Sequence, residues 1–212
     1  MNNTICINGF YIWRESDNEK LPDVSFIPPM VRRRMTDLQK IALGVANRVA
    51  PKDANYQIIF ASRYGEWQQT IKLITQFHTD SEMSPAGFSN SVHNAAAGAF
   101  SILTKNKNSY TSIAAGARTL ESGILAALMA RGPVLFIYAE EKSPEMYEPF
   151  LESRVSAHGM AVMLSGSGKR GVTLEYDEYE RGALTFDAVA NFLDNGGAIS
   201  ASCGKMVDKC YA

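Results

Sequence analysis

The sequence predicts an α/β fold with a mixed, mostly parallel sheet, helices on both faces and one buried central helix. Over residues 1–140, strand-like apolar segments alternate with segments in which apolar residues recur every three or four positions. The segment 134–140 (VLFIYAE) is apolar without polar alternation, as is typical of a strand covered on both faces. A chain of 212 residues, of which 46% are hydrophobic, is long enough to build one substantial core.

The first part of the chain predicts a strand, a helix and then a strand followed by a helix. Residues 4–13 (TICINGFYIW) have the β-branched and aromatic composition of a strand. Pro28 and Pro29 precede a helix whose apolar face carries Met35, Leu38, Ile41, Ala42, Val45 and Val49. Residues 57–62 (QIIFAS) predict a short strand, and helical spacing follows at Trp67, Ile71, Ile74 and His78. We expect His78 to pack on the apolar face of that helix.

The middle of the chain predicts two helices with a strand between them. Residues 94–103 (NAAAGAFSIL) are rich in small residues, which allow a helix to approach its neighbours closely. Residues 108–114 (NSYTSIA) predict a strand, and Gly116 begins a turn into a helix over 120–129. Because that helix is apolar almost all round, we expect it to lie buried between layers as the central helix.

The last part of the chain predicts an antiparallel edge and a short helix. Residues 159–165 and 171–179 are expected to pair as a hairpin through the turn at 166–169. The stretch LTFDAVANFLDNGG predicts a short helix with a glycine stop. Without a repeat or a linker, the simplest organisation is one domain over 1–212. In it, 141–158 form a surface excursion and 183–212 a C-terminal extension.

Charge and cysteine content exclude several classes of function. Lys and Arg number 21 against 22 Asp and Glu, so a net charge of -1 gives no field for nucleic-acid binding. Three cysteines without metal-ligand spacing indicate a reducing compartment, and we expect the cytoplasm. The amino terminus lacks the basic start and apolar core of a signal peptide. The longest central apolar stretch, 123–130, is too short for a membrane span.

Motifs for metal or phosphate binding are weak. The three histidines, His78, His93 and His158, follow no zinc-binding pattern, so we expect no metal and no cofactor. We expect His158 to be an ordinary packing residue. Residues 165–169 (SGSGK) lack the spacing of a phosphate-binding loop and are better explained as a turn. The acidic run 175–180 (EYDEYE) suits a solvated edge strand.

The segment 112–123 (SIAAGARTLESG) passes from a strand through small residues directly into a helix. In many α/β enzymes such an elbow presents a reactive Cys or Ser at the positive end of the helix. Here the elbow holds Gly116, Ala117 and Arg118, and a methyl group cannot attack a thioester. Ser112 in the strand and Thr119 in the helix would both need a base that the nearby sequence does not supply.

Two segments, SPAGFSNSVHNAAAGAFSI (84–102) and SYTSIAAGARTLESGILAAL (109–128), resemble the β-ketoacyl synthases from the interface loop to the nucleophile elbow. Ala117 occupies the place of the family's nucleophilic cysteine. PVLFIYAEE and HGMAVMLS resemble later strands of the family, so the likeness extends from about Pro28 to Ser165. The first segment matches the family at Ser84, Pro85, Asn94, Gly98 and Ile102, and in the second Ser112, Ile113 and Ala114 lead into the elbow in step with the family.

The resemblance implies half of a thiolase-like fold, without the second half that carries the two histidines of condensation. This arrangement is similar to the short ketosynthase-like N-terminal family, which includes the chain-length-factor subunits of aryl polyene clusters. It implies a noncatalytic subunit that pairs with a full-length ketosynthase and shapes its acyl tunnel in polyene or fatty-acid-type biosynthesis. Acyl carrier protein would then be an indirect partner.

The resemblance also implies roles for particular residues. The partner interface is expected to contain Asn94, Tyr110, Thr111, Ser112, Ile113 and Ala114. The closed end of the acyl tunnel is expected to contain Phe88, Ser91, Val92 and His93.

Three alternatives stay open. The tunnel residues could merely pack beneath the helix at 94–103. The chain could be a self-standing acyl-transfer or hydrolytic enzyme that uses Ser112, Thr119 or a tail cysteine, Cys203 or Cys210. It could also be a homodimeric acyl-binding scaffold.

Overall fold

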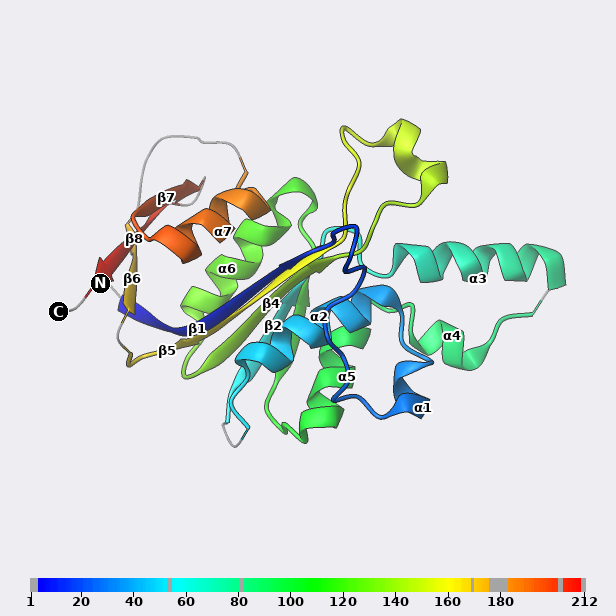
Figure 1. The fold of residues 1–212 in the computed structure, drawn as a ribbon, viewed down its shortest axis with the longest axis horizontal. Helices are drawn as coiled ribbons and strands as arrows, with labels where there is room; N and C mark the ends of the chain where they lie inside the picture. Colours follow the sequence, from blue (N-terminus) through cyan, green and yellow to red (C-terminus); the bar gives the residue numbers. More distant parts are fainter. Residues whose placement is uncertain are drawn as a thin grey trace.

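A computed structural model of the chain describes residues 4–52, 55–80, 82–168, 170–175, 183–201 and 204–210. Its strands form one sheet in the order β3-β2-β4-β5-β1-β6-β8-β7 (Figure 1). The strands are β1 (Thr4–Arg14), β2 (Gln57–Ala61), β3 (Tyr110–Ile113), β4 (Val134–Glu140), β5 (His158–Ser165), β6 (Arg170–Glu175), β7 (Ala198–Ala201) and β8 (Gly204–Cys210). The helices are α1 (Pro29–Arg32), α2 (Asp37–Val49), α3 (Trp67–Asp80), α4 (Pro85–Ser89), α5 (Ala95–Thr104), α6 (Thr119–Met129) and α7 (Phe186–Asn195). Two short 3₁₀ helices are η1 (Gly116–Arg118) and η2 (Glu145–Phe150).

The sheet is mixed, as predicted, but it is not mostly parallel. Only the pairings of β2 with β3 and with β4 are parallel, and the other pairings among the described strands are antiparallel. Strand β1 contributes two of the antiparallel pairings, because it lies between β5 and β6 and runs antiparallel to both. Strand β4, which is apolar up to its last residue, Glu140, is buried along its whole length, as its sequence predicted.

The predicted hairpin between 159–165 and 171–179 is wrong, because β1 separates the two strands. After β5 the chain crosses the end of β1 and continues as β6 on its other side. A side chain at Gly168 would have its Cβ 2.8 Å from the Cβ of Cys6, so this close crossing requires glycine. Residues 176–179 of the expected second strand, and most of the acidic run 175–180, lie outside the described residues.

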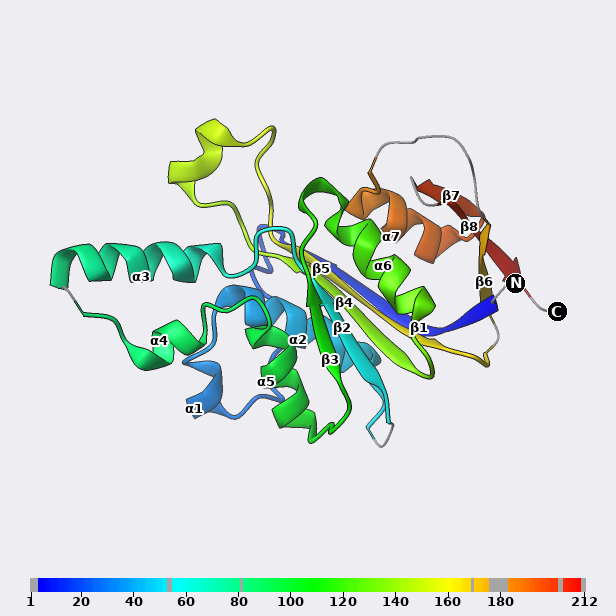
Figure 2. The same ribbon diagram turned by 180° about the vertical axis from the view of Figure 1, so that it is seen from behind.

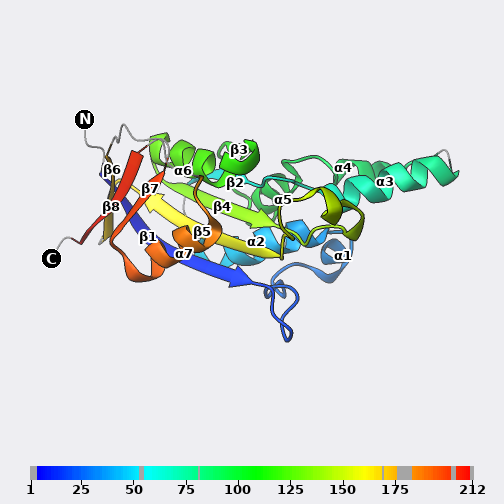
Figure 3. The same cartoon turned by 90° about the horizontal axis from the view of Figure 1, so that it is seen from above.

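Helices cover both faces of the sheet. On one face, α2 packs on β1, β4 and β5, and α5 packs on β2 and β3 (Figures 1 and 2). On the other face, α6 packs on β2 and β4, and α7 lies beside it (Figure 3). The predicted apolar face of α2 is buried, and Thr36 caps the helix by accepting a hydrogen bond from the amide of Gln39 at 3.1 Å. One apolar cluster forms on each face of the sheet.

Helix α6 is not buried all round, which corrects the expectation of a buried central helix. Its inner face packs so closely on the sheet that a Cβ at Gly123 would lie 2.7 Å from the Phe136 ring and 2.8 Å from Ala61. Met129, at its far end, is 74% exposed. The described chain forms one sheet with a single helix layer on this face, so nothing packs over the outer side of α6. The predicted C-terminal helix exists as α7 and buries Val189, Ala190, Phe192 and Leu193.

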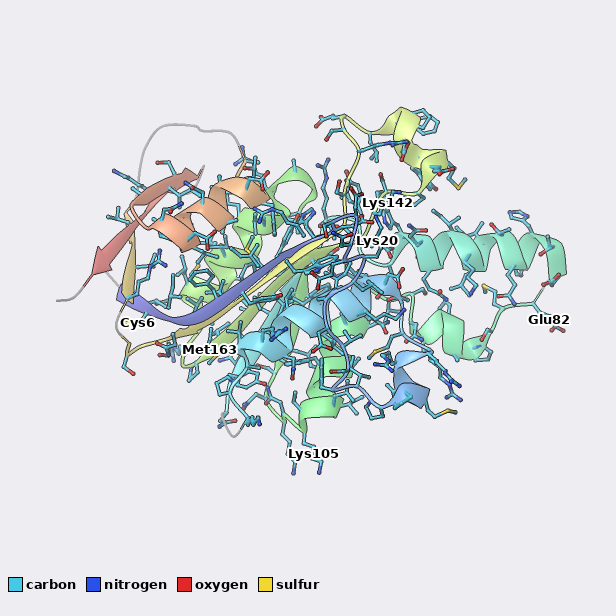
Figure 4. All side chains as sticks on the ribbon, viewed as in Figure 1. Cys6, Lys20, Glu82, Lys105, Lys142 and Met163 are labelled. Atoms are coloured by element: carbon cyan, nitrogen blue, oxygen red, sulfur yellow. The ribbon has the colours of Figure 1, made fainter. Side chains whose placement is uncertain are left out.

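Helix α3 extends away from the sheet (Figure 1). Leu73 is its only buried residue, and His78 is exposed, so the expectation that His78 packs on an apolar face is wrong. Glu82, beyond the end of α3, lies at the far tip of this projection (Figure 4). His158, by contrast, packs its ring against Phe186 with centroids 4.3 Å apart. No helix in the described ranges has both the length and the apolar character to cross a membrane.

Candidate functional site

The strand-to-helix elbow lies between β3 and α6, where the sequence predicted it. Gly116 makes the turn with a φ of 57°, a left-handed conformation that favours glycine. The amide of Ala115 donates to Thr119 Oγ1 at 2.8 Å, and the Thr119 hydroxyl donates to the carbonyl of Gly116 at 2.8 Å. Ala117 is exposed beside these bonds, so the corner is well ordered and presents a methyl group.

Neither hydroxyl near the elbow is placed to act as a nucleophile. The Thr119 hydroxyl is buried and serves as a structural clamp of the turn. Ser112 Oγ is buried and has no hydrogen-bond partner among the described residues, so no base contacts it. The side chains of Cys203 and Cys210 lie outside the described residues.

The segment 110–114 lies at a free edge of the sheet. Strand β3 is the end member of the strand order and pairs with β2 alone among the described strands. Tyr110, Thr111 and Ala114 are exposed, whereas Ser112 and Ile113 are half-buried. Such an edge offers unpaired backbone groups to another chain.

Helix α5 flanks this edge and adds apolar surface to it. A Cβ at Gly98 would lie 3.4 Å from the Tyr110 hydroxyl, so the helix contacts the edge strand at this point. Ile102 is one helical turn further along the same side of α5 and is 79% exposed. Asn94, just before the helix, is also exposed.

The predicted tunnel residues divide into two groups. Phe88, at 57% exposure, and Val92 are exposed, so the alternative that they pack beneath α5 does not describe these two side chains. The Ser91 hydroxyl donates to the carbonyl of Phe88 at 2.8 Å and holds the bend of the loop. Helix α4, which carries Phe88, is capped by Ser84, whose hydroxyl accepts from the amide of Gly87 at 3.2 Å.

His93 faces the body of its own chain. Its Nε2 lies 2.8 Å from the carbonyl oxygen of Ser62, and its ring centroid is 5.7 Å from that of Phe60. A Cβ at Gly65 would lie 2.8 Å from the His93 ring. The segment 88–94 runs from the end of α4 to the start of α5 and is called the 88–94 loop below. His93 therefore ties this loop to the turn after β2.

Sequence reasoning missed a group of buried glutamates at the carboxyl ends of β2 and β4. The Glu140 carboxylate accepts from Ser62 Oγ at 3.1 Å and from the amides of Arg63 and Tyr64, the latter at 3.4 Å. Burial raises the pKa of Glu140 to about 7. The signal was present, because two consecutive carboxylates, Glu140 and Glu141, directly follow the apolar run 134–139.

Two more glutamates are buried nearby, Glu141 and Glu66. Glu141 accepts from the amide of Gln68 at 3.0 Å, in the first turn of α3. Burial raises the pKa of Glu141 to about 8 and that of Glu66 to about 7. Within the described ranges, no cluster of His, Cys, Asp and Glu side chains could hold a metal ion. Glu140 thus braces the turn that His93 contacts and Glu141 braces the base of α3, whereas the buried Glu66 carboxylate has no hydrogen-bond partner of ordinary geometry among the described residues.

The comparisons with known proteins agree with this geometry. The family model described as "Beta-ketoacyl synthase, N-terminal domain" matches residues 11–191. No curated protein matches the chain.

Solved structures of ketosynthase complexes share the fold. A chain of the ketosynthase (ApeO) in complex with its chain length factor (ApeC) from Xenorhabdus doucetiae is 18% identical, with a TM-score of 0.76. That match covers 98% of this chain and 99% of the other. The ishigamide ketosynthase/chain length factor is 14% identical, with a TM-score of 0.62 over 80% of this chain and 65% of that one.

A β-ketoacyl synthase from Burkholderia phymatum STM815 is 11% identical, with a TM-score of 0.60. The match covers 80% of this chain and 63% of that one, so this chain spans less than two thirds of the larger proteins. Both the sheet and the elbow thus correspond to one half of a thiolase-like ketosynthase fold. The chain belongs to the β-ketoacyl synthase N-terminal domain family.

Proposed function

We propose that this chain is a noncatalytic, chain-length-factor-like subunit that pairs with a full-length β-ketoacyl-ACP synthase. The single observation that carries the proposal is the exposed Ala117 at an otherwise well-formed elbow. The turn and the helix that would activate a thiol are retained, but the side chain has no nucleophilic atom. The chain keeps the shape of a ketosynthase half and lacks its reacting group.

The free β3 edge supports pairing with another chain. Strand pairing across this edge would satisfy the outward backbone groups of 110–113, and Ile102 would be covered in the same contact. Likeness to chains from ketosynthase and chain-length-factor complexes supports a ketosynthase as that partner. A second copy of this chain could also use the edge, which keeps the homodimeric scaffold as a second candidate.

The 88–94 loop supports a role in shaping the acyl tunnel of the partner. Phe88 and Val92 project from the loop, whereas Ser91 and His93 hold it in place. A bulky, fixed side chain at the end of an apolar tunnel limits chain length by steric exclusion. The partner's cysteine would carry the growing chain, and acyl carrier protein would deliver it there. We place this chemistry in polyene or fatty-acid-type biosynthesis in the cytoplasm.

Co-expression with the full-length ketosynthase that co-purifies from the native organism tests the proposal. We expect a complex with one copy of each chain by light scattering, and condensation of acyl and malonyl thioesters by the complex. The chain alone should give neither condensation nor thioester hydrolysis. Turnover by the chain alone that disappears in Ser112→Ala or Thr119→Val would support the stand-alone enzyme and overturn the proposal.

A further inference from the structure

A projecting loop after β4 has a closed and rigid base. This η2 loop, residues 144–154, leaves the body beyond Lys142 and stands clear of the sheet and of α3 (Figures 1 and 4). At its base the amide of Ser143 donates to the carbonyl of Val155 at 2.9 Å, and the amide of Val155 donates to Ser143 Oγ at 3.3 Å. Ser143 is buried, so the two ends of the loop are fixed to the core.

The loop holds large apolar side chains out in solvent. Phe150 is 82% exposed, Met146 62% and Tyr147 40%, all within one short 3₁₀ helix. An ion pair between Glu148 and Arg154 links the two sides of the loop, and the Tyr147 amide donates to the carbonyl of Pro144 at 3.0 Å. Because the backbone that carries these side chains is already held by the closed base and the ion pair, less chain entropy is lost on binding, which favours an interface anchor.

The charge of the loop defines what it can bind. Residues 144–154 contain Glu145, Glu148 and Glu152 against the single base Arg154. Because Glu148 pairs with Arg154, two exposed acidic residues without an ion pair to any described residue, Glu145 and Glu152, flank the apolar segment 146–150 as an acidic rim. The complementary surface is an apolar pocket bordered by Arg or Lys, and an acidic surface would be repelled.

The position of the loop relates it to the β3 edge. Strands β2, β3 and β4 are parallel, so the elbow after β3 and the loop after β4 leave the sheet at the same end (Figure 2). A partner chain that covers the β3 edge and the elbow therefore lies at the end of the sheet from which the η2 loop projects.

We infer that the η2 loop is a second docking element, which seats Phe150 in a basic-rimmed apolar pocket of the ketosynthase partner. This inference rests on the proposed function, because it takes the same partner. It adds a contact that is separate from the β3 edge and from the tunnel loop.

The affinity of the full chain for the purified full-length ketosynthase, measured by calorimetry, tests the inference. Phe150→Ser should weaken binding by at least about tenfold. Met129→Ser is the matched control, because Met129 is a similarly exposed apolar residue at the end of α6 that is remote from the elbow. The affinity of the Met129→Ser chain for the ketosynthase should not change. Both side chains are largely in solvent, so unfolding curves of the two variants should equal that of the unsubstituted chain.

A charge variant tests the acidic rim. The double variant Glu145→Lys/Glu152→Lys should weaken binding several-fold at low salt and less at high salt, because salt screens exposed charges.

Unchanged affinity in both loop variants, with an intact complex, overturns the docking role and leaves the proposed function standing. Equal weakening by Met129→Ser also overturns it. If the unsubstituted chain binds no ketosynthase, both conclusions fall. If Phe150→Ser alters only self-association, the loop contacts a second copy and the inference is wrong.

Discussion

At the scale of single residues, the elbow keeps its hydrogen-bonded turn but has no nucleophilic side chain at position 117. Thr119 and Gly116 build the turn, and the corner carries only a methyl group. None of the described contacts of the histidines is with the elbow itself: His93 contacts Ser62, His158 packs on Phe186 and His78 is exposed on α3.

Ala117→Cys should place a reactive thiol at the corner without creating a condensing enzyme. We expect an iodoacetamide adduct at position 117, because the site is exposed and lies at the start of α6. Condensation by the chain alone should remain at background, measured as release of carbon dioxide from malonyl thioester. Condensation above background in this variant would show that the elbow needs only its thiol.

Phe88→Ala should lengthen the products of the partner synthase by opening the end of the tunnel. Mass spectrometry of the products from the purified complex measures the change. Phe77→Ala is the matched control, because Phe77 is similarly exposed on α3 but lies outside the 88–94 loop. Unchanged product lengths with Phe88→Ala would mean that this loop is structural.

At the scale of elements, the tight contact between α6 and the sheet depends on one glycine. Gly123→Ala should destabilise the chain by about 1–3 kcal/mol, because the added Cβ would overlap Phe136 and Ala61. Urea denaturation followed by circular dichroism measures the loss. Gly166→Ala, where an added Cβ meets nothing within 4 Å, should leave the midpoint unchanged. A stable Gly123→Ala protein would contradict the packing described here.

The edge formed by β3 and α5 makes a separate prediction. Ile102→Glu should weaken the complex with the ketosynthase by about tenfold or more, because it places a charge in an apolar contact. The same substitution should leave the folding of the isolated chain unchanged, since Ile102 is almost fully in solvent. Calorimetry and thermal unfolding together check both statements. Loss of folding, or unchanged affinity, would contradict the assignment of this edge.

At the scale of the whole molecule, the buried glutamates link stability to pH. Their folded pKa values, about 7 for Glu66 and Glu140 and about 8 for Glu141, exceed the ordinary value of 4.5. Between pH 4.5 and 8 the folded chain therefore binds more protons than the unfolded chain, and the free energy of unfolding falls as pH rises. His158, whose pKa burial lowers, acts in the opposite direction below pH 6.5.

The variant Glu140→Gln isolates the contribution of Glu140 to the pH dependence of stability. We expect urea denaturation at intervals from pH 5 to 8 to show a declining free energy of unfolding in the unsubstituted chain. The slope should be smaller in Glu140→Gln, which has no proton to lose at that position. A slope that is unchanged by the substitution would show that Glu140 does not carry the pH dependence.

The sequence predicted the parts of this molecule that depend on local pattern. The apolar run of β4, the stripe of α2 and the passage from β3 into α6 all follow from periodicity and small residues. The place of β1 between β5 and β6 could not be predicted, because it depends on pairing between residues such as Cys6 and Ser165, far apart in the chain. The inward turn of His93 and the burial of Glu66 likewise depend on tertiary contacts.

The central claim is that this chain takes no acyl group onto itself. Intact-mass measurement of both chains, after incubation of the purified complex with acyl-loaded carrier protein, tests it most directly. The account predicts an acyl adduct on the ketosynthase and an unchanged mass for this chain, in the complex and alone. A covalent acyl adduct on this polypeptide would contradict the account.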